Sequence, residues 1–241
     1  MYKVAENVYL EVGSGEPIES ENLVEFRLLF EGELKPSGGS NSRAPEKHEI
    51  RRVFHPQLRR LWLTHNNLRQ LAERKGRIAY AEELRHQGIN GYPSGQLSVE
   101  DAINKAFVYI GSNWNRSGYQ CVPLATQEMA LRCSLDILLL RPEEDRFIFT
   151  QGDIDGQVKT LFDALRIPKN LDEAGGTAPD ADETPFFCLL EDDRLISEVR
   201  VNSDRLLLLP NTRKVTANDS FAVITVKINH RSPGMTDQWF A

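Results

Sequence analysis

The sequence has few cysteines and no long apolar run. Only three of its 241 residues are cysteine, and an odd number of widely spaced cysteines without a C-x-x-C pair argues against a disulfide framework or a zinc site. The four leucines at 206–209 form a far shorter run than the roughly 20 apolar residues that cross a bilayer. The N-terminal segment contains acidic residues and is not typical of a signal peptide. We therefore expect a protein of the reducing cytoplasm with no membrane association.

Negative charge exceeds positive charge overall, but positive charge is locally concentrated. The formal net charge is -6, which argues against attraction of nucleic acid to the whole surface. The segment 43–77, however, holds ten lysines and arginines against three glutamates. Such a basic segment can contact phosphates, although a solvated helix face is the alternative interpretation. The candidate nucleic-acid-binding residues are Arg51, Arg52, Arg59 and Arg60.

Hydrophobic patterning predicts an alternation of strands and helices. With 40% hydrophobic and 27% charged residues, the composition is that of an ordinary globular protein. Helical spacing predicts a helix over 55–76, with Pro56 in its first turn and Gly76 at its end. A shorter helix is predicted over 98–110, opened by a capping box of Ser98 and Asp101, and another within 152–165. Strand-like patterns occur at 22–30, 130–137, 146–150, 186–191, 195–202, 205–210 and 221–229.

This order of elements predicts a single α+β domain over 1–241 with a mixed, mostly antiparallel β-sheet packed by helices. Within it we expect an N-terminal elaboration. The pattern weakens over 77–119, which we interpret as an insertion without an assigned role. The polar segment 168–185 is too long for an ordinary connection and is interpreted as an acidic surface loop, a disordered insertion or a lid.

Acidic residues are spaced in a way that predicts a shared polar face. Asp153 and Asp155 are two residues apart, so at the end of a strand their side chains point the same way. Asp155, Lys159 and Asp163 then follow at intervals of four along the polar side of the next helix. On its own, D-x-D is common at strand ends, and Lys159 with Asp163 is equally readable as an ordinary surface pair.

A second acidic pair, Asp192 and Asp193, comes from a later segment. It is open to interpretation as a turn with side-chain to backbone bonding. Carboxylates from both segments within about 4 Å of one another would repel by roughly 4 kcal/mol per pair at a dielectric near 20. Protonation or a divalent cation relieves that repulsion, and ligands that are all oxygen favour Mg²⁺ or Mn²⁺. A nearby lysine would then stabilise phosphate charge, which suits phosphodiester hydrolysis.

The acidic pattern resembles a known family. The string D-x-D-x-x-x-K-x-x-x-D-A-L at 153–165, followed by D-D-x-x-I at 192–196, is similar to the motif of the RusA family of Holliday junction resolvases. That family has D-x-D-N-x-x-K-x-x-x-D-A-L and then D-D before a strand. The similarity extends more loosely over about 130–228, where strands flank the motif in the same order.

The resemblance implies a RusA-like fold and a Mg²⁺-dependent endodeoxyribonuclease that cuts branched DNA such as Holliday junctions. It implies that the metal-binding carboxylates are Asp153, Asp155 and Asp193, with Asp192 as a fourth, and that Lys159 is the catalytic lysine beside Asp155. It further implies a homodimer, which places one site on each of two opposed DNA strands. Recombination and repair are the processes that such an activity serves.

Three departures from the family motif leave other functions open. Gly156 stands where the family has asparagine. The basic run often found before the motif is missing, with only Arg146 near, and the loop between Lys159 and Asp192 is longer. A catalytically diverged member that binds DNA or a protein without cutting is the first alternative. A nucleotide-sugar transferase that uses D-x-D to hold a metal on a diphosphate ranks lower, because no nucleotide-binding βα pattern is recognisable.

Overall fold

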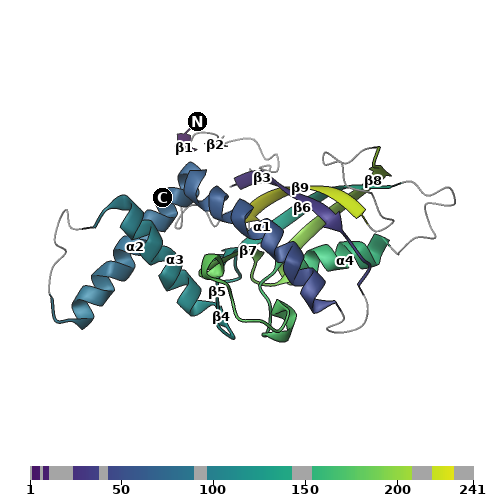
Figure 1. The fold of residues 1–241 in the computed structure, drawn as a ribbon. Helices are drawn as coiled ribbons and strands as arrows, with labels where there is room; N and C mark the ends of the chain where they lie inside the picture. The colour runs from purple at the N-terminus through teal and green to yellow at the C-terminus, as the bar shows by residue number, and fades with distance from the viewer. Residues whose placement is uncertain are drawn as a thin grey trace.

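A computed structural model describes residues 2–5, 8–10, 24–37, 43–89, 97–142, 154–207 and 219–230. The chain folds as an α+β protein with mixed sheets, as the sequence predicts (Figure 1). None of the described helices is both long and apolar enough to cross a membrane.

The larger sheet has four strands in the order β3-β9-β6-β8. Its central strands, β9 and β6, are antiparallel to each other; β3 is antiparallel to β9, and β8 is parallel to β6. Inward and outward residues alternate along β6, because successive side chains of a strand point to opposite faces. The strands are β3 (Val24–Glu33), β6 (Leu131–Arg141), β8 (Ile196–Arg205) and β9 (Asp219–His230).

The remaining strands form two smaller sheets. One has the order β4-β5-β7, with β4 antiparallel and β7 parallel to β5. The other is a hairpin of β1 and β2. Antiparallel pairings outnumber parallel ones, which confirms the predicted character of the sheets. The bounds are β1 (Tyr2–Ala5), β2 (Val8–Leu10), β4 (Asn115–Arg116), β5 (Tyr119–Ala125) and β7 (Phe186–Leu190). The strand predicted at 146–150 lies outside the described residues, and 205–210 is described only to residue 207.

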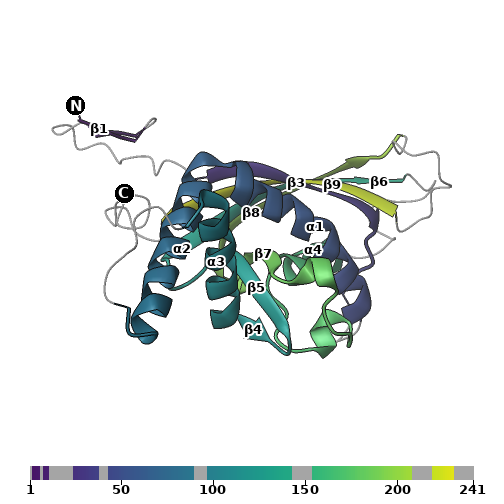
Figure 2. The same cartoon turned by 60° about the vertical axis from the view of Figure 1, so that its left-hand side comes forward.

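Four helices and three short 3-10 helices complete the described fold. Helices α1 and α4 lie beneath the larger sheet in Figure 2, and α2 and α3 lie side by side at one end. The helices are α1 (Ala44–Thr64), α2 (Asn66–His86), α3 (Val99–Asn113) and α4 (Ile154–Leu165). The 3-10 helices are η1 (Asp172–Ala174), η2 (Ala181–Glu183) and η3 (Asp193–Leu195).

The single helix predicted over 55–76 is wrong, because this stretch contains the end of one helix and the beginning of another. Pro56 lies inside α1 rather than in its first turn. The helix is interrupted at His65, where α1 ends and α2 begins. Gly76 lies in the interior of α2, where it permits a close helix crossing. A Cβ at this position would fall 1.6 Å from the carbonyl oxygen of Ala102 on α3. The glycine is therefore required by packing and does not end the helix.

The segment 77–119 forms the second half of α2, all of α3 and strand β4. The predicted cap of α3 is confirmed, because the Ser98 hydroxyl accepts a hydrogen bond from the Asp101 amide at 3.0 Å. Helix α3 packs against both α2 and β5. This segment therefore contributes to the hydrophobic core.

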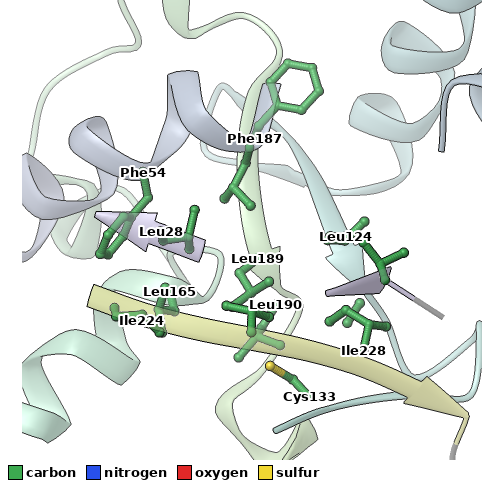
Figure 3. Close-up of a cluster of buried hydrophobic side chains, with 14 of the residues drawn as sticks. Leu28, Phe54, Leu124, Cys133, Leu165, Phe187, Leu189, Leu190, Ile224 and Ile228 are labelled. Atoms are coloured by element: carbon green, nitrogen blue, oxygen red, sulfur yellow. The ribbon is translucent and has the colours of Figure 1, made fainter. Parts of the chain in front are cut away.

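One large hydrophobic core joins the four-stranded sheet and the β4-β5-β7 sheet to the helices. Figure 3 shows Leu28 of β3 and Ile224 of β9 near Phe54 of α1 and Leu165 of α4, with Leu189 of β7 between the two sheets. All five are at most 1% exposed. Burial of this apolar surface supplies the main driving force of folding, and it fixes α4, the helix that carries the acidic motif, beneath the sheet.

Candidate functional site

Helix α4 presents the first part of the acidic motif. Its apolar stripe, with Leu161 and Leu165, is buried as the spacing predicts. Asp155 lies in the first turn, where the helix dipole favours a carboxylate. Both Asp155 and Lys159 are exposed at the surface. The burial of one face therefore leaves the catalytic candidates on the solvent side.

The second acidic segment lies against the same helix. Helix η3 begins at Asp193 and packs against α4. It follows directly from β7, which runs through the core between β5 and the end of α4. Asp193 is exposed. Burial alone would lower the pKa of Arg166, just after α4, but the bond to Glu173 and the nearby charges, of which Asp193 contributes the least, hold it above the usual value. Helices α4 and η3 are therefore in contact, with Asp193 acting on Arg166 beyond the last turn of α4, whereas Asp155 lies in the first turn.

Asp192 is engaged in local bonding. Its side chain accepts hydrogen bonds from the backbone amide of Arg194 at 3.0 Å and from the Arg194 guanidinium at 2.8 Å. The guanidinium and the amide together lower the pKa of Asp192 to about 2. The turn with side-chain to backbone bonding is therefore present, as the alternative interpretation of this pair holds.

Asp163 pairs with residues other than Lys159. Its carboxylate lies 2.7 Å from Lys47 of α1 and 3.2 Å from Arg166. All three side chains are mostly buried, with Asp163 at 14% exposed. This ion pair joins α1 to α4, so the third acidic residue of the motif has a structural role.

The described carboxylates do not by themselves make a metal centre. Their oxygen atoms are the ligand type that Mg²⁺ prefers. Yet the described residues, which include Asp155, Asp192 and Asp193, contain no group of three or more His, Cys, Asp or Glu that could hold a metal ion. Asp153, the first carboxylate of the motif, lies outside the described residues. A metal site here would therefore need Asp153.

Close packing accounts for the glycine at position 156, where the RusA motif has asparagine. Its carbonyl accepts a hydrogen bond from the Ser37 amide at 2.8 Å. A Cβ at this position would lie 2.9 Å from the Cβ of Pro36 and 3.2 Å from the Ser37 nitrogen. The segment after β3 therefore occupies the space that a side chain at 156 would need.

The proposed phosphate contact of Arg51 is wrong. Arg51 is 2% exposed, and its guanidinium donates to the backbone carbonyls of Asp163, Glu173 and Arg166 at 2.6, 2.7 and 3.2 Å. These bonds connect α1 to the end of α4 and to η1. The helical pattern correctly places Arg51 on α1, but it does not reveal that this face packs against the segment after α4.

Arg52 is likewise engaged in ion pairs. It donates to Glu183 and Asp180 of the 168–185 segment and lies near Glu49. Glu183 is 3% exposed; burial alone would raise its pKa, but the bond from Arg52 holds it below the usual value. Ion pairs from Asp180 and Glu183 therefore attach this segment to α1, while more than half of its residues are exposed.

Arg59 and Arg60 remain as surface candidates for a phosphate. Both are exposed and line a groove of about 550 Å³ between α1 and the segment around Asp182. Asp180 and Glu183 form its opposite wall with Asp182. This groove was not predicted, because its two walls are more than a hundred residues apart in the chain.

Two buried histidines, His48 and His55, lie beneath the groove, and His48 contacts Tyr119. His55 accepts a hydrogen bond from the Phe187 amide at 2.9 Å and lies 3.1 Å from the Asp182 carbonyl. His48 lies 3.2 Å from the hydroxyl of Tyr119. Burial lowers the pKa of both histidines, that of His48 to about 4 with help from the charge of Arg51. Both rings are therefore neutral at neutral pH.

Comparison with family models, with curated proteins and with solved structures gave no match to this chain. The assignment of a function consequently depends on the motif and on the geometry of α4 and η3.

Proposed function

We propose that the chain is a divalent-metal-dependent endonuclease of the RusA-like type, which hydrolyses phosphodiester bonds in branched DNA such as Holliday junctions. The observation that carries the proposal is the contact between α4 and η3. It joins the helix of Asp155 and Lys159 to the one that begins at Asp193, which are the two segments that the family motif requires.

In this proposal Asp153, Asp155 and Asp193 hold Mg²⁺ or Mn²⁺. When bound, the ion would supply an activated water and charge neutralisation at the phosphate. Lys159, exposed one helical turn after Asp155, would stabilise the negative charge that develops on the phosphate oxygens. Asp192 is assigned a supporting role, since its bonds to Arg194 hold the turn that presents Asp193.

Arg59 and Arg60 are proposed to hold the DNA backbone. They are exposed on α1, whereas Arg51 is buried and Arg52 is paired with Glu183. Each phosphate contact that is lost should weaken binding of all DNA sequences alike and reduce the salt dependence of binding by about one unit of slope. The Arg59→Ala and Arg60→Ala variants are compared with Arg69→Ala, which removes an exposed arginine from α2.

The decisive experiment uses a labelled four-way junction and a linear duplex, each with and without Mg²⁺. Cleavage of the junction that requires Mg²⁺ is expected for the native chain. Asp155→Asn is expected to reduce cleavage at least about a hundredfold while lowering the free energy of unfolding by no more than about 1 kcal/mol. Asp172→Asn is the matched control, since it removes a carboxylate from η1. Cleavage at the native rate by Asp155→Asn would exclude the proposal.

A second candidate is a diverged member that binds DNA or a protein without cutting. The absence of a three-residue metal-binding group among the described carboxylates favours it, as does the close packing at Gly156. Binding to a junction without cleavage in either Mg²⁺ or Mn²⁺ would support this candidate over the nuclease. A homodimer and a reducing cytoplasm remain the proposed setting for both, and the three cysteines are free thiols.

A further inference from the structure

The two edge strands of the four-stranded sheet differ in whether other groups bond to their outward-facing backbone N–H and C=O groups. At the β3 edge, the Gln57 amide of α1 accepts a hydrogen bond from the Leu29 amide at 2.9 Å and donates one to the Leu29 carbonyl at 2.8 Å. These bonds occupy groups that would otherwise be open to another strand. At the opposite edge, β8 pairs with β6 alone within the described part of the chain.

The exposed edge is long and carries an apolar side chain. Strand β8 has 10 residues, and none of them is a proline. Val199 is opposite the buried Leu135 of β6, so it lies on the core side of the sheet, yet it is 40% exposed. A long edge of this kind is a template for a further strand, which would cover such apolar surface.

We propose that β8 pairs in antiparallel fashion with β8 of a second copy of this chain. The pairing would join two four-stranded sheets into one continuous sheet, with a two-fold axis perpendicular to it. Rotation about such an axis leaves each face of the sheet on the same side. Two residues that face each other across the axis must therefore have their side chains on the same face, so they are separated by an even number of positions in the sequence. The axis must therefore pass through a residue position of β8.

The charges of β8 select the position of that axis. With the axis at Val201, the two-fold symmetry would create two pairs in which Glu198 of one copy faces Asp204 of the other. Like charges directly opposite each other destabilise a sheet. With the axis at Asn202, Arg200 faces Asp204 of the second copy twice. Opposite charges at facing positions stabilise the pair.

A third position, Val199, would also place opposite charges face to face. It would, however, pair the beginning of β8, where the ladder with β6 is irregular between Ile196 and Glu198. The axis at Asn202 uses only the regular part of the strand. Arg200, whose side chain is 67% exposed and 3.6 Å from Asp136, would then be shared between two carboxylates.

Self-association and DNA cleavage can be tested separately. Sedimentation velocity of the full chain over a range of micromolar concentrations is expected to show a dimer. Asp204→Arg places two pairs of arginines face to face, and we expect it to raise the dissociation constant about tenfold or more. The double variant Arg200→Asp with Asp204→Arg restores opposite charges and should recover the dimer.

Glu31→Arg is the matched control for the charge change. Glu31 lies in the same cross-strand row as Asp204, through Phe221 and Leu140, but at the β3 edge. It should leave the dissociation constant unchanged. Circular dichroism of each variant establishes that it is folded. A native chain that stays monomeric, or a dimer that Asp204→Arg does not weaken, would overturn the proposal.

A cross-link tests the register independently of charge. Asn202→Cys places two thiols at the axis, where strand spacing permits a disulfide. Oxidation with glutathione disulfide should give a covalent dimer on a non-reducing gel. Ser203→Cys is the control, because Ser203 faces Val201 of the second copy and two cysteines there are too far apart. The native cysteines are buried. Equal cross-linking of both variants, or none of Asn202→Cys, would exclude this register.

Discussion

Lys47 of α1 and Asp163 of α4 form an ion pair with 2.7 Å between Nζ and Oδ2, although 116 residues separate them. Both side chains are largely buried, at 11% and 14% exposed. Arg166 contacts the other carboxylate oxygen of Asp163, so the pair has a second cation. The ion pair therefore fixes the position of α4, the helix of the acidic motif, against α1.

Asp163→Asn should destabilise the fold, because it leaves the ammonium of Lys47 buried without a full counter-charge. We expect the free energy of unfolding to fall by about 2 kcal/mol, as measured by urea denaturation. Lys159→Met, one turn earlier on the exposed side, should change it by less than about 0.5 kcal/mol and yet abolish cleavage. The reverse pattern would refute the division between a structural aspartate and a catalytic lysine.

Stability should fall as the solution is acidified below pH 6.5. The pKa of His48 in the folded chain is about 4, against 6.5 for an unperturbed histidine, so between these values the unfolded chain binds the additional proton. The stability associated with neutral His48 is thus complete above pH 6.5 and is lost as the pH falls through 4, by up to about 3 kcal/mol. Denaturant unfolding at a series of pH values measures this loss.

His48→Phe should reduce the slope of stability against pH by the equivalent of about one proton, since phenylalanine does not titrate. His86→Phe, which removes an exposed histidine at the end of α2, is the matched control for the substitution. If both variants follow the native pH profile, His48 is not the titrating group.

Gly76→Ala should disrupt the crossing of α2 and α3. The added Cβ would fall on the backbone oxygen of Ala102, which cannot rotate away as a flexible side chain can. We expect a loss of about 3 kcal/mol in the free energy of unfolding. Arg69→Ala, on the exposed side of the same helix, should be nearly neutral. A stable Gly76→Ala variant would mean that the helices are farther apart.

Gly156→Asn introduces the asparagine of the RusA motif but should not raise the rate of cleavage above that of the native chain. Its Cβ would press against Pro36 and the Ser37 backbone, so we expect a loss of about 1–3 kcal/mol in the free energy of unfolding. Gly156→Ala adds the same Cβ and should cost a similar amount. Thermal unfolding and the junction assay check both effects; a stable and more active asparagine variant would contradict this account.

The sequence determined those features that depend on local periodicity. The alternation along β6, the apolar stripe of α4 and the Ser98 cap of α3 are all present as predicted, because each reflects which face of a single element is buried. The α+β class follows from the order of such elements. The acidic motif was likewise visible in the sequence, since it is defined by the spacing of residues along the chain.

The tertiary structure alone decided the partners of individual residues. Arg51 and Asp163 lie where the helical pattern places them, but which backbone carbonyls or cations meet them depends on segments more than a hundred residues away. Gly76 likewise allows a helix crossing that its own sequence neighbours do not indicate. Periodicity records only how much of a residue is buried, whereas the identity of its neighbours depends on how distant elements pack.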